Sequence, residues 1–452
     1  MKDHVHDCVV VGAGPAGSAA ALQMARDGLD VVLLERGIRP GEKNVMSGVL
    51  LTNKLQSLVP DFREQAPLQR CITAGYERYL LGEEEILTLP ALRSYRSDRY
   101  PSPPYTVFRS EFDAWFAQQA VEAGAELFTE TLVEDLLWDD GRVAGVRTRR
   151  GDLRARVVIG ADGVNSTVAD RARLGVPPTP SALSLIVRQV LDLPAKRIEE
   201  RFHLRPGEGV LSLFYGPIAG PNGHKGIYYS ELYTNRDSLS MTAEVPLDVL
   251  QACGVPAYDV LTERERHPYI ARLIEGAALR EYQAHLIPWG GTDNLDDLYR
   301  DGVLLVGDAG RFTTKDGVGS WPSMASGTAA ARTVKHACDR RDFSESTLSV
   351  YQNFLAAEGL VDTQREARRE WEGRDTYRKM VIESLAPIFQ VAGRYADEWV
   401  VGKGEHPYSV WGEAYHSLVK PVAPWYLRWP LGLAAWMNTR RWRRQQREIR
   451  RR

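Results

Sequence analysis

The sequence is short of cysteine, of net charge and of long apolar runs, and each shortage excludes a class of protein. Its 452 residues include four cysteines, Cys8, Cys71, Cys253 and Cys338, and no two are spaced as CxxC. This excludes a disulfide framework, a zinc ribbon and a four-cysteine iron–sulfur cluster, and we expect no metal site. The formal net charge of −2 provides no overall positive field, so no nucleic-acid partner is expected.

Targeting and membrane-spanning patterns are also missing from the sequence. The first residues, MKDHVHDCVVVGAG, lack the basic and apolar regions of a secretory signal, and no apolar run approaches the roughly 18 residues of a membrane-spanning helix. Apolar residues make up 44% and charged residues 26%, an ordinary composition for a folded globular protein. We therefore expect a cytoplasmic enzyme, with peripheral contact at the inner face of the membrane as a further possibility.

The glycine-rich turn over residues 12–17, GAGPAG, carries the strongest functional signal. A β-branched run over residues 6–11 precedes it, an Ala-rich helical pattern over 18–26 follows, and residues 30–34 read as a second strand. This strand–turn–helix–strand context turns a weak GxGxxG match into a strong prediction of dinucleotide binding. The phosphates are expected at the amino end of the helix, where unpaired N–H groups and the helix dipole favour negative charge.

Each glycine of the turn has a distinct expected role. Gly12 permits the tight turn, Gly14 lets the backbone approach a pyrophosphate, and Gly17 lets the helix pack against the sheet. Glu35, which ends the second strand, is expected to accept hydrogen bonds from a ribose diol.

Two later segments favour FAD over NAD as the dinucleotide. The GPAG form of the turn resembles FAD-binding proteins of the glutathione-reductase-like superfamily. Residues 157–166 run as a strand into Asp162-Gly163, and residues 302–310 run as a strand into Asp308. These resemble the DG and GD motifs of FAD-dependent hydroxylases and reductases, although Asp-Gly alone is also a common turn. A carboxylate at the carboxyl end of a parallel strand is placed to accept a hydrogen bond from a flavin hydroxyl.

The expected fold class is α/β, with a glutathione-reductase-like FAD-binding Rossmann domain, an inserted antiparallel-sheet substrate domain and a helical carboxyl-terminal region. The predicted boundaries are 1–181 and 285–341 for the FAD-binding domain, 182–284 for the insertion and 342–452 for the helical region. Within the first part, a helix is expected over 110–123 with Ser110 as its N-cap, which places Arg109 just before the helix.

Beyond the cofactor motifs, the sequence resembles the FixC-type flavoproteins, relatives of electron-transfer-flavoprotein:quinone oxidoreductase and geranylgeranyl reductase. The resemblance covers about residues 5–365 and lacks the ferredoxin-like domain of the long quinone oxidoreductases. The segments that carry it are 41–48 (GEKNVMSG), 232–240 (LYTNRDSLS), 282–288 (YQAHLIP), 301–309 and 342–344 before a helix at Tyr351. It implies non-covalently bound FAD that exchanges electrons at one substrate site.

The candidate site residues follow from these motifs and this resemblance. The candidate FAD-binding residues are Gly12, Gly14, Pro15, Ala16, Gly17, Glu35, Arg36, Lys43, Asn44, Arg109, Val133, Ala161, Asp162, Gly163, Gly307, Asp308, Gly317, Val318 and Gly319. The candidate catalytic residues are Lys43, Tyr282, His285 and Lys315. Alternatives stay open for three of these: a packed aromatic at Tyr282, a structural histidine at 285 and a solvated loop lysine at 315.

The expected function is electron exchange between flavin and a hydrophobic organic substrate or a carrier, with quinone, electron-transfer flavoprotein and ferredoxin as candidate partners. The alternative is an NAD(P)H-dependent flavin monooxygenase that acts on a specialised metabolite, with NAD(P)H as reductant. The last thirteen residues hold eight arginines, and three tryptophans lie nearby at 429, 436 and 442. Arginine and tryptophan both favour an anionic membrane surface, so this tail is a candidate peripheral membrane contact, a disordered tail or a docking segment for protein.

Overall fold

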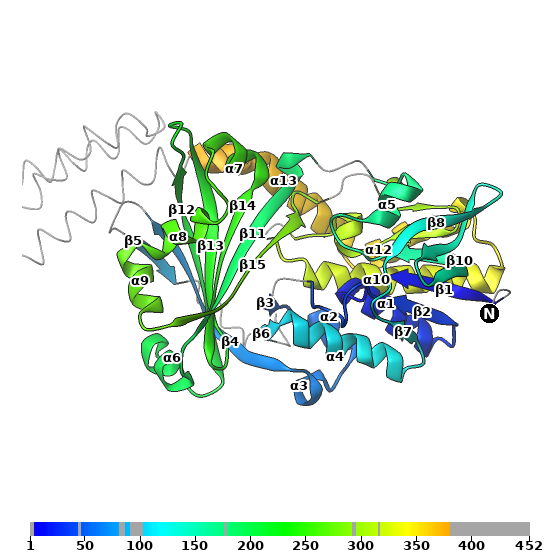
Figure 1. Ribbon diagram of the computed structural model, residues 1–452, viewed down its shortest axis with the longest axis horizontal. Helices are drawn as coiled ribbons and strands as arrows, with labels where there is room; N and C mark the ends of the chain where they lie inside the picture. Colours follow the sequence, from blue (N-terminus) through cyan, green and yellow to red (C-terminus); the bar gives the residue numbers. More distant parts are fainter. Residues whose placement is uncertain are drawn as a thin grey trace, which may run out of the picture.

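The computed structural model describes residues 4–43, 47–80, 86–90, 103–175, 179–291, 295–314 and 317–379. The predicted site residues Asn44 and Lys315, and the whole arginine-rich tail, lie outside these ranges. Two sheets lie side by side, each with its own helices, and the chain passes between them several times (Figure 1).

The first sheet is the predicted dinucleotide-binding sheet. Its strand order is β16–β17–β10–β1–β2–β7, and neighbours from β17 to β7 are parallel. β8 and β9 form a hairpin around the predicted turn at residues 139–141, and β9 pairs antiparallel with β10. The strands are β1 (Val5–Val11), β2 (Val31–Leu34), β7 (Glu126–Phe128), β8 (Val133–Asp139), β9 (Arg142–Thr148), β10 (Gly151–Gly160), β16 (Tyr299–Arg300) and β17 (Val303–Leu305).

The register of this sheet brings the predicted motifs together at one edge. Val11 pairs with Gly160, and Gly160 pairs with Leu305, so β1, β10 and β17 end side by side. The glycine turn, the Asp-Gly turn and the Gly-Asp turn follow these three ends. This is the edge at which ligands bind in open α/β sheets.

Three long helices pack together beside this sheet. They are α1 (Pro15–Arg26), α4 (Arg109–Glu122) and α10 (Ser320–Arg340), and α1 packs against both of the others. Small residues such as Ala19, Ala20 and Ala331 are fully buried there, which allows the helices to lie close. The predicted N-cap at Ser110 is wrong, because α4 begins one residue earlier and Phe108 is its N-cap, with no side-chain hydrogen bond.

The second sheet is larger and takes strands both from the predicted insertion and from residues 47–108, which precede it in the chain. Its order is β15–β11–β14–β13–β12–β4–β6–β3, with β5 paired to β4. All neighbours are antiparallel except β4 and β12, which are parallel. The strands are β3 (Ser47–Leu50), β4 (Leu68–Leu80), β5 (Ile86–Pro90), β6 (Tyr105–Phe108), β11 (Leu183–Asp192), β12 (Glu208–Ala219), β13 (Lys225–Thr234), β14 (Ser238–Pro246) and β15 (Ala278–Pro288).

The remaining helices cover the two sheets. On the second sheet, α8 packs against β11 and β14, and α8 and α9 lie on the side turned away from the first sheet (Figure 1). None of the helices within the described ranges is long and apolar enough to cross a membrane. These further helices are α2 (Asn53–Leu58), α3 (Phe62–Gln65), α5 (Thr167–Ala172), α6 (Ala195–Phe202), α7 (Leu247–Cys253), α8 (Asp259–Glu265), α9 (Pro268–Ile274), α11 (Glu345–Leu348), α12 (Tyr351–Ala357) and α13 (Leu360–Lys379).

Candidate functional site

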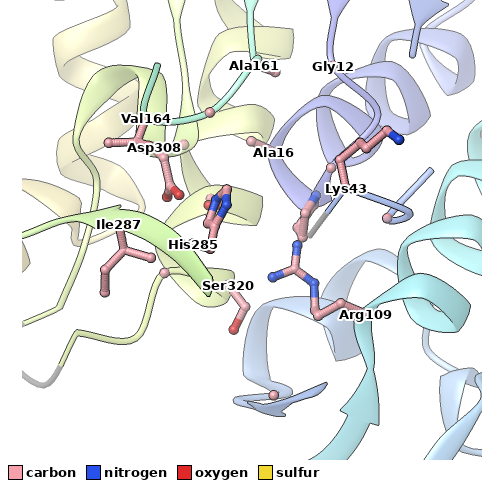
Figure 2. A pocket seen from close by; sticks show the side chains of 18 of the residues that line it. Gly12, Ala16, Lys43, Arg109, Ala161, Val164, His285, Ile287, Asp308 and Ser320 are labelled. Carbon is pink, nitrogen blue, oxygen red and sulfur yellow. The ribbon is translucent and has the colours of Figure 1, made fainter. Parts of the chain in front are cut away.

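A cavity of about 310 Å³ lies between the two sheets. One wall is formed by the turns after β1, β10 and β17, and the other by one face of β11, β13, β14 and β15. Figure 2 shows Asp308 and Ala161 from the first wall and His285 and Ile287 from the second wall around the same space. We call these the nucleotide wall and the sheet wall.

The glycines of the first turn divide into two that fit closely and one that borders open space. A Cβ on Gly17 would lie 1.9 Å from the Gly12 carbonyl oxygen, and one on Gly12, whose φ is +104°, would lie 2.4 Å from the Ala161 carbonyl oxygen. A Cβ on Gly14 would meet nothing within 4 Å. Gly17 therefore closes the helix onto the turn without lining the cavity, and Gly14 leaves its backbone accessible from the cavity.

Glu35 is held by the backbone around it. Its Oε2 accepts a hydrogen bond from the N–H of Ala13 at 3.2 Å, and its Oε1 accepts one from the N–H of Gly37 at 2.7 Å. The carboxylate lines the cavity and is 9% exposed. Each oxygen keeps acceptor capacity for a ribose hydroxyl, as the sequence predicts.

Asp162 lines the cavity but already has two partners of its own. It accepts a hydrogen bond from the Ser166 hydroxyl at 2.5 Å and one from the N–H of Val168 at 3.1 Å. Ser166 is in turn the N-cap of α5 and accepts from the N–H of Ala169. Burial raises the pKa of Asp162. The aspartate therefore fixes the start of α5, a role that the motif alone did not indicate.

Asp308 follows β17 and points into the cavity (Figure 2). Burial raises the pKa of its carboxyl to about 6, and the positive charge of Arg109 opposes that rise. Behind it, the N–H of Gly307 donates to the Ser326 hydroxyl at 3.0 Å, which fixes the turn against α10. The cavity side of Asp308 borders Gly319, where a Cβ would lie 3.4 Å from Asp308 Oδ1.

Arg109 reaches the cavity from the first residue of α4, where Figure 2 shows its guanidinium opposite His285. Its Nε and Nη2 each donate to one oxygen of Asp113 at 2.8 Å, and Asp113 is fully buried. Such a two-point contact fixes the plane of the guanidinium as well as its position. Arg109 therefore brings an oriented positive charge to the junction of the two walls.

The sheet wall is made by alternate residues of neighbouring strands. On β14, Glu244 lies opposite Ile186 of β11 and Tyr229 of β13, and Ile186 lies opposite His285 of β15. Two residues along, Thr242 lies opposite Arg188 and Glu231. Residues directly opposite one another share a face, so these side chains form two rows across the wall. All seven line the cavity: Ile186, Arg188, Tyr229, Glu231, Thr242, Glu244 and His285.

The two catalytic candidates on β15 lie on different faces of the strand. His285 lines the cavity, whereas Tyr282, three residues earlier, is 42% exposed and does not line it. An odd separation in a strand places two side chains on opposite faces, so the structure does not bring Tyr282 to the site. Burial lowers the pKa of His285, and the positive charges of Arg109, Arg36 and Arg188 lower it further.

Most predicted site residues that the structure describes are brought together at the cavity. Lys43 lines its rim, is exposed and lies 4.0 Å from Glu42. The exceptions are Gly17 and Tyr282. Those that line the cavity are Gly12, Gly14, Pro15, Ala16, Glu35, Arg36, Lys43, Arg109, Val133, Ala161, Asp162, Gly163, His285, Gly307, Asp308, Gly317, Val318 and Gly319.

Sequence reasoning missed the polar residues of the sheet wall, foremost Arg188, Glu231 and Glu244. Their signal was present as charged residues inside strand patterns, at LIVRQVL, YSELYT and MTAEVP. A charged residue in a strand that is buried on both faces requires a partner or a function. Glu244 is only 5% exposed, and every residue of β14 is buried.

The described residues fit an FAD molecule in this cavity. Gly14, Gly48 and Gly163 border the cavity with no heavy atom within 4 Å of an added Cβ, which leaves room for a ligand against the backbone. Ser320, the first residue of α10, lines the same space, and its buried hydroxyl has no hydrogen-bond partner among the described residues. Glu35 and Asp308 add carboxylate acceptors for sugar hydroxyls.

Comparison with known proteins agrees with this fit. A family model described as an FAD binding domain matches residues 6–203. Protein FixC of Bradyrhizobium diazoefficiens is 38% identical over 360 residues, which cover 78% of this chain and 81% of FixC.

Two solved structures share the fold. A geranylgeranyl bacteriochlorophyll reductase-like protein from Thermoplasma acidophilum matches with a TM-score of 0.65 at 19% identity, covering 82% of this chain and 87% of that one. PqsL, a probable FAD-dependent monooxygenase from Pseudomonas aeruginosa, matches with a TM-score of 0.56 at 18% identity, covering 82% of this chain and all of PqsL. At such identities the likeness concerns the fold alone.

Proposed function

Because this chain belongs to the FixC family and is an FAD-dependent oxidoreductase, we propose that it exchanges electrons between FAD and a hydrophobic organic substrate or carrier. FAD supplies the redox chemistry when it is bound, and the protein supplies binding, orientation and access. A quinone or an electron-transfer flavoprotein is the partner class that we favour, with ferredoxin as a further candidate.

The apolar part of the cavity is the observation that carries this proposal. Val49 and Leu50 of β3, Val107 of β6, Ile186 and Ile287 all line it. They come from four separate strands, β3, β6, β11 and β15, and meet beside the polar groups of the sheet wall. An apolar patch of this kind, with a few placed polar groups beside it, suits a hydrophobic organic molecule.

The polar residues around the cavity have separable tasks in this proposal. The glycine turn, Glu35 and Asp308 hold the pyrophosphate and sugar hydroxyls. Arg109 and the amino end of α10 provide positive potential where a reduced cofactor carries negative charge. His285 is a neutral imidazole at neutral pH in this proposal, because burial and three nearby arginines lower its pKa.

Stopped-flow spectroscopy under anaerobic conditions tests this function. The purified protein is reduced with dithionite and mixed with a short-chain ubiquinone analogue or with electron-transfer flavoprotein, and the flavin absorbance is followed. Rapid reoxidation by either partner is the expected result. A reduced flavin that no organic partner reoxidises contradicts the proposal.

The monooxygenase alternative is tested by a second stopped-flow experiment, in which NAD(P)H replaces dithionite and oxygen replaces the organic acceptor. NAD(P)H would reduce the flavin quickly, and oxygen would then give an oxygenated product. NAD(P)H oxidation without dependence on an organic electron carrier would favour this alternative.

The proposed membrane contact of the arginine-rich tail is tested separately, by sedimentation with anionic vesicles before and after deletion of residues 438–452.

A further inference from the structure

The sheet wall contains two glutamates on one face of adjacent strands. Glu231 of β13 lies opposite Thr242, and Glu244 lies two residues beyond Thr242 on β14. The two carboxyl groups are therefore diagonal neighbours on the face that lines the cavity. Two carboxylates so placed in a buried wall do not both ionise easily, because each disfavours the charge of the other.

The two glutamates differ in the hydrogen bonds that the structure gives to their Oε1 atoms. The hydroxyl of Tyr229 donates a hydrogen bond to Glu231 Oε1. Glu244 Oε1 is buried and has no hydrogen-bond partner among the described residues. Arg188 provides a positive charge to both, while its Nε donates to Thr242 Oγ1 at 2.8 Å.

Glu244 also lies against the loop that predictions from sequence place beside the flavin. A Cβ on Gly317 would lie 3.2 Å from both carboxyl oxygens of Glu244, and a Cβ on Gly319 would lie 3.4 Å from Asp308 Oδ1. The segment 317–319 thus has the glutamate of the sheet wall on one side and the aspartate of the nucleotide wall on the other.

We propose that Glu244 exchanges a proton with the organic electron partner of the enzyme, at the sheet wall of the cavity, while Glu231 keeps Glu244 in its protonated form. This inference rests on the proposed function and names the residue that completes it. Its partner class is an organic molecule that gains or loses protons together with electrons, such as a quinone.

The proton balance is simple. A neutral acceptor that takes two electrons takes two protons to become a neutral product. The electron pair and one proton come from the reduced cofactor, and the second proton leaves Glu244, whose carboxylic acid becomes a carboxylate. Solvent then returns one proton to Glu244. In the opposite direction, the carboxylate of Glu244 accepts the proton that the substrate loses.

The electrostatics of the wall agree with this role. Burial raises the pKa of Glu244 to about 8, the negative charge of Glu231 adds to the rise, and Arg188 and the Ser184 hydroxyl oppose it. Burial also raises the pKa of Glu231, against the charge of Arg188. Among the described residues of the sheet wall, the other titratable groups that line the cavity are Tyr229 and His285, each in the same row as Glu244. Tyr233 and Glu281 lie further along the same face, outside the cavity lining. A pKa near the working pH is the condition for a residue that both gives and takes protons.

Infrared spectroscopy of the protein tests the protonation directly, without turnover. A buried carboxylic acid has a carbonyl band that shifts in deuterium oxide. We expect this band at neutral pH in the wild type, its loss in Glu244→Gln, and a lower titration midpoint in Glu231→Gln. Equal spectra of the wild type and Glu244→Gln would overturn the inference.

Two electron acceptors then separate proton transfer from electron transfer. We expect Glu244→Gln to slow reoxidation by a short-chain ubiquinone analogue at least about tenfold, the lower range of general acid catalysis being about a hundredfold. Reoxidation by ferricenium, which takes an electron and no proton, is expected to keep its rate. Equal slowing of both acceptors, or of neither, would contradict the role of Glu244.

Control variants keep the result interpretable. Glu263→Gln removes an exposed carboxylate of α8, away from the cavity, and is expected to change neither spectrum nor rate. If Glu244→Gln does not fold, Glu244→Asp keeps the acid but shortens it, and is expected to keep the band while slowing only the quinone. The wild-type protein could show the carbonyl band of Glu244 while no organic acceptor reoxidises its reduced flavin. That result would contradict the proposed function, and it would also contradict the transfer of the Glu244 proton to an electron partner.

Discussion

The two walls of the cavity recognise their ligands in different ways. The nucleotide wall presents mainly backbone, at Gly12, Gly14 and Gly163, and its side chains are tied to their own turns. The sheet wall presents side chains, two rows of alternate residues from four strands. Backbone recognition suits a cofactor that a whole family shares. Side-chain recognition can vary with single substitutions, which suits the substrate.

The largest expected effect comes from filling the closest contact of the nucleotide wall. Gly17→Ala would place a methyl carbon 1.9 Å from the Gly12 carbonyl oxygen and 3.2 Å from the Ala161 Cβ, and the close contact is with backbone that has little freedom to move. We expect it to lower the free energy of unfolding by more than about 3 kcal/mol, or to prevent folding. Thermal unfolding of the protein without FAD measures this effect.

Gly14→Ala is the matched variant, because its methyl group enters open space. Gly14 is the N-cap of α1, and we expect a stability change below about 1 kcal/mol, the usual size of an N-cap effect. FAD affinity should nevertheless fall, since the methyl group occupies the ligand side of the turn. An equal stability loss in both variants would contradict the distinction between the two glycines.

The second effect concerns the charge pair at the junction of the walls. Arg109→Met leaves Asp113 buried without its two-point partner, and breaking such a pair costs about 3–5 kcal/mol. Chemical denaturation measures this loss, and Asp113→Asn in the same chain should restore part of it. Because Arg109 also lowers the pKa of His285, NMR titration should show a higher His285 pKa in the variant. An unchanged His285 titration would contradict the effect of the Arg109 charge on His285.

The third effect has opposite signs for stability and for binding. Burial raises the pKa of Asp308 in the folded protein to about 6, against an ordinary value of 3.8 for an aspartate. Between these two values the folded protein retains a proton that the unfolded chain has lost. Stability of the FAD-free protein therefore falls as the pH rises from about 4 to 6, and the full cost remains above that range, about 2–3 kcal/mol.

Asp308→Asn tests this linkage. We expect the FAD-free variant to be more stable than the wild type at pH 8 and equally stable at pH 4, by thermal unfolding. Its FAD affinity should fall at least about tenfold, or ~1.4 kcal/mol, because an acceptor for sugar hydroxyls is lost. A variant that binds FAD as tightly as the wild type would remove Asp308 from the proposed site.

The smallest effect is expected on the outer face of β15. Tyr282→Phe should change flavin reduction and reoxidation less than about twofold, because the hydroxyl lies on the face away from the cavity. His285→Gln, three residues along the strand, is the matched variant on the cavity face and should change the reoxidation rate more. The reverse order of effects in stopped-flow traces would contradict this register of β15.

These predictions also show which parts of the molecule the sequence specifies locally. The glycine turn and Asp308 were predictable because each motif fixes one strand end, and parallel strands end at a common edge. Asp162 was predictable as a site residue but not as the anchor of α5, since the motif does not show what Ser166 and Val168 donate to it.

The sheet wall was less accessible to sequence reasoning. Arg188 and Glu244 are 56 positions apart, and only the β11–β14 register places them on one face. The segment 232–240 is one of those that carry the resemblance to the FixC-type flavoproteins, and the structure shows a structural role for it. Buried Asn235 bridges Ser238 and Ser240, and Arg70 of β4 donates to the Asn235 carbonyl oxygen. A motif can therefore mark a turn that sets register rather than a residue that touches ligand.

The parallel pairing of β4 with β12 has a consequence for how such enzymes diversify. β3, β4 and β6 precede most of the nucleotide-binding strands in the chain, yet they lie in the other sheet. The polypeptide is interleaved, so excising or grafting the inserted segment alone would deprive β4 and β12 of their pairing with each other. A change of substrate preference that keeps this pairing is therefore expected to come from single substitutions in the sheet wall.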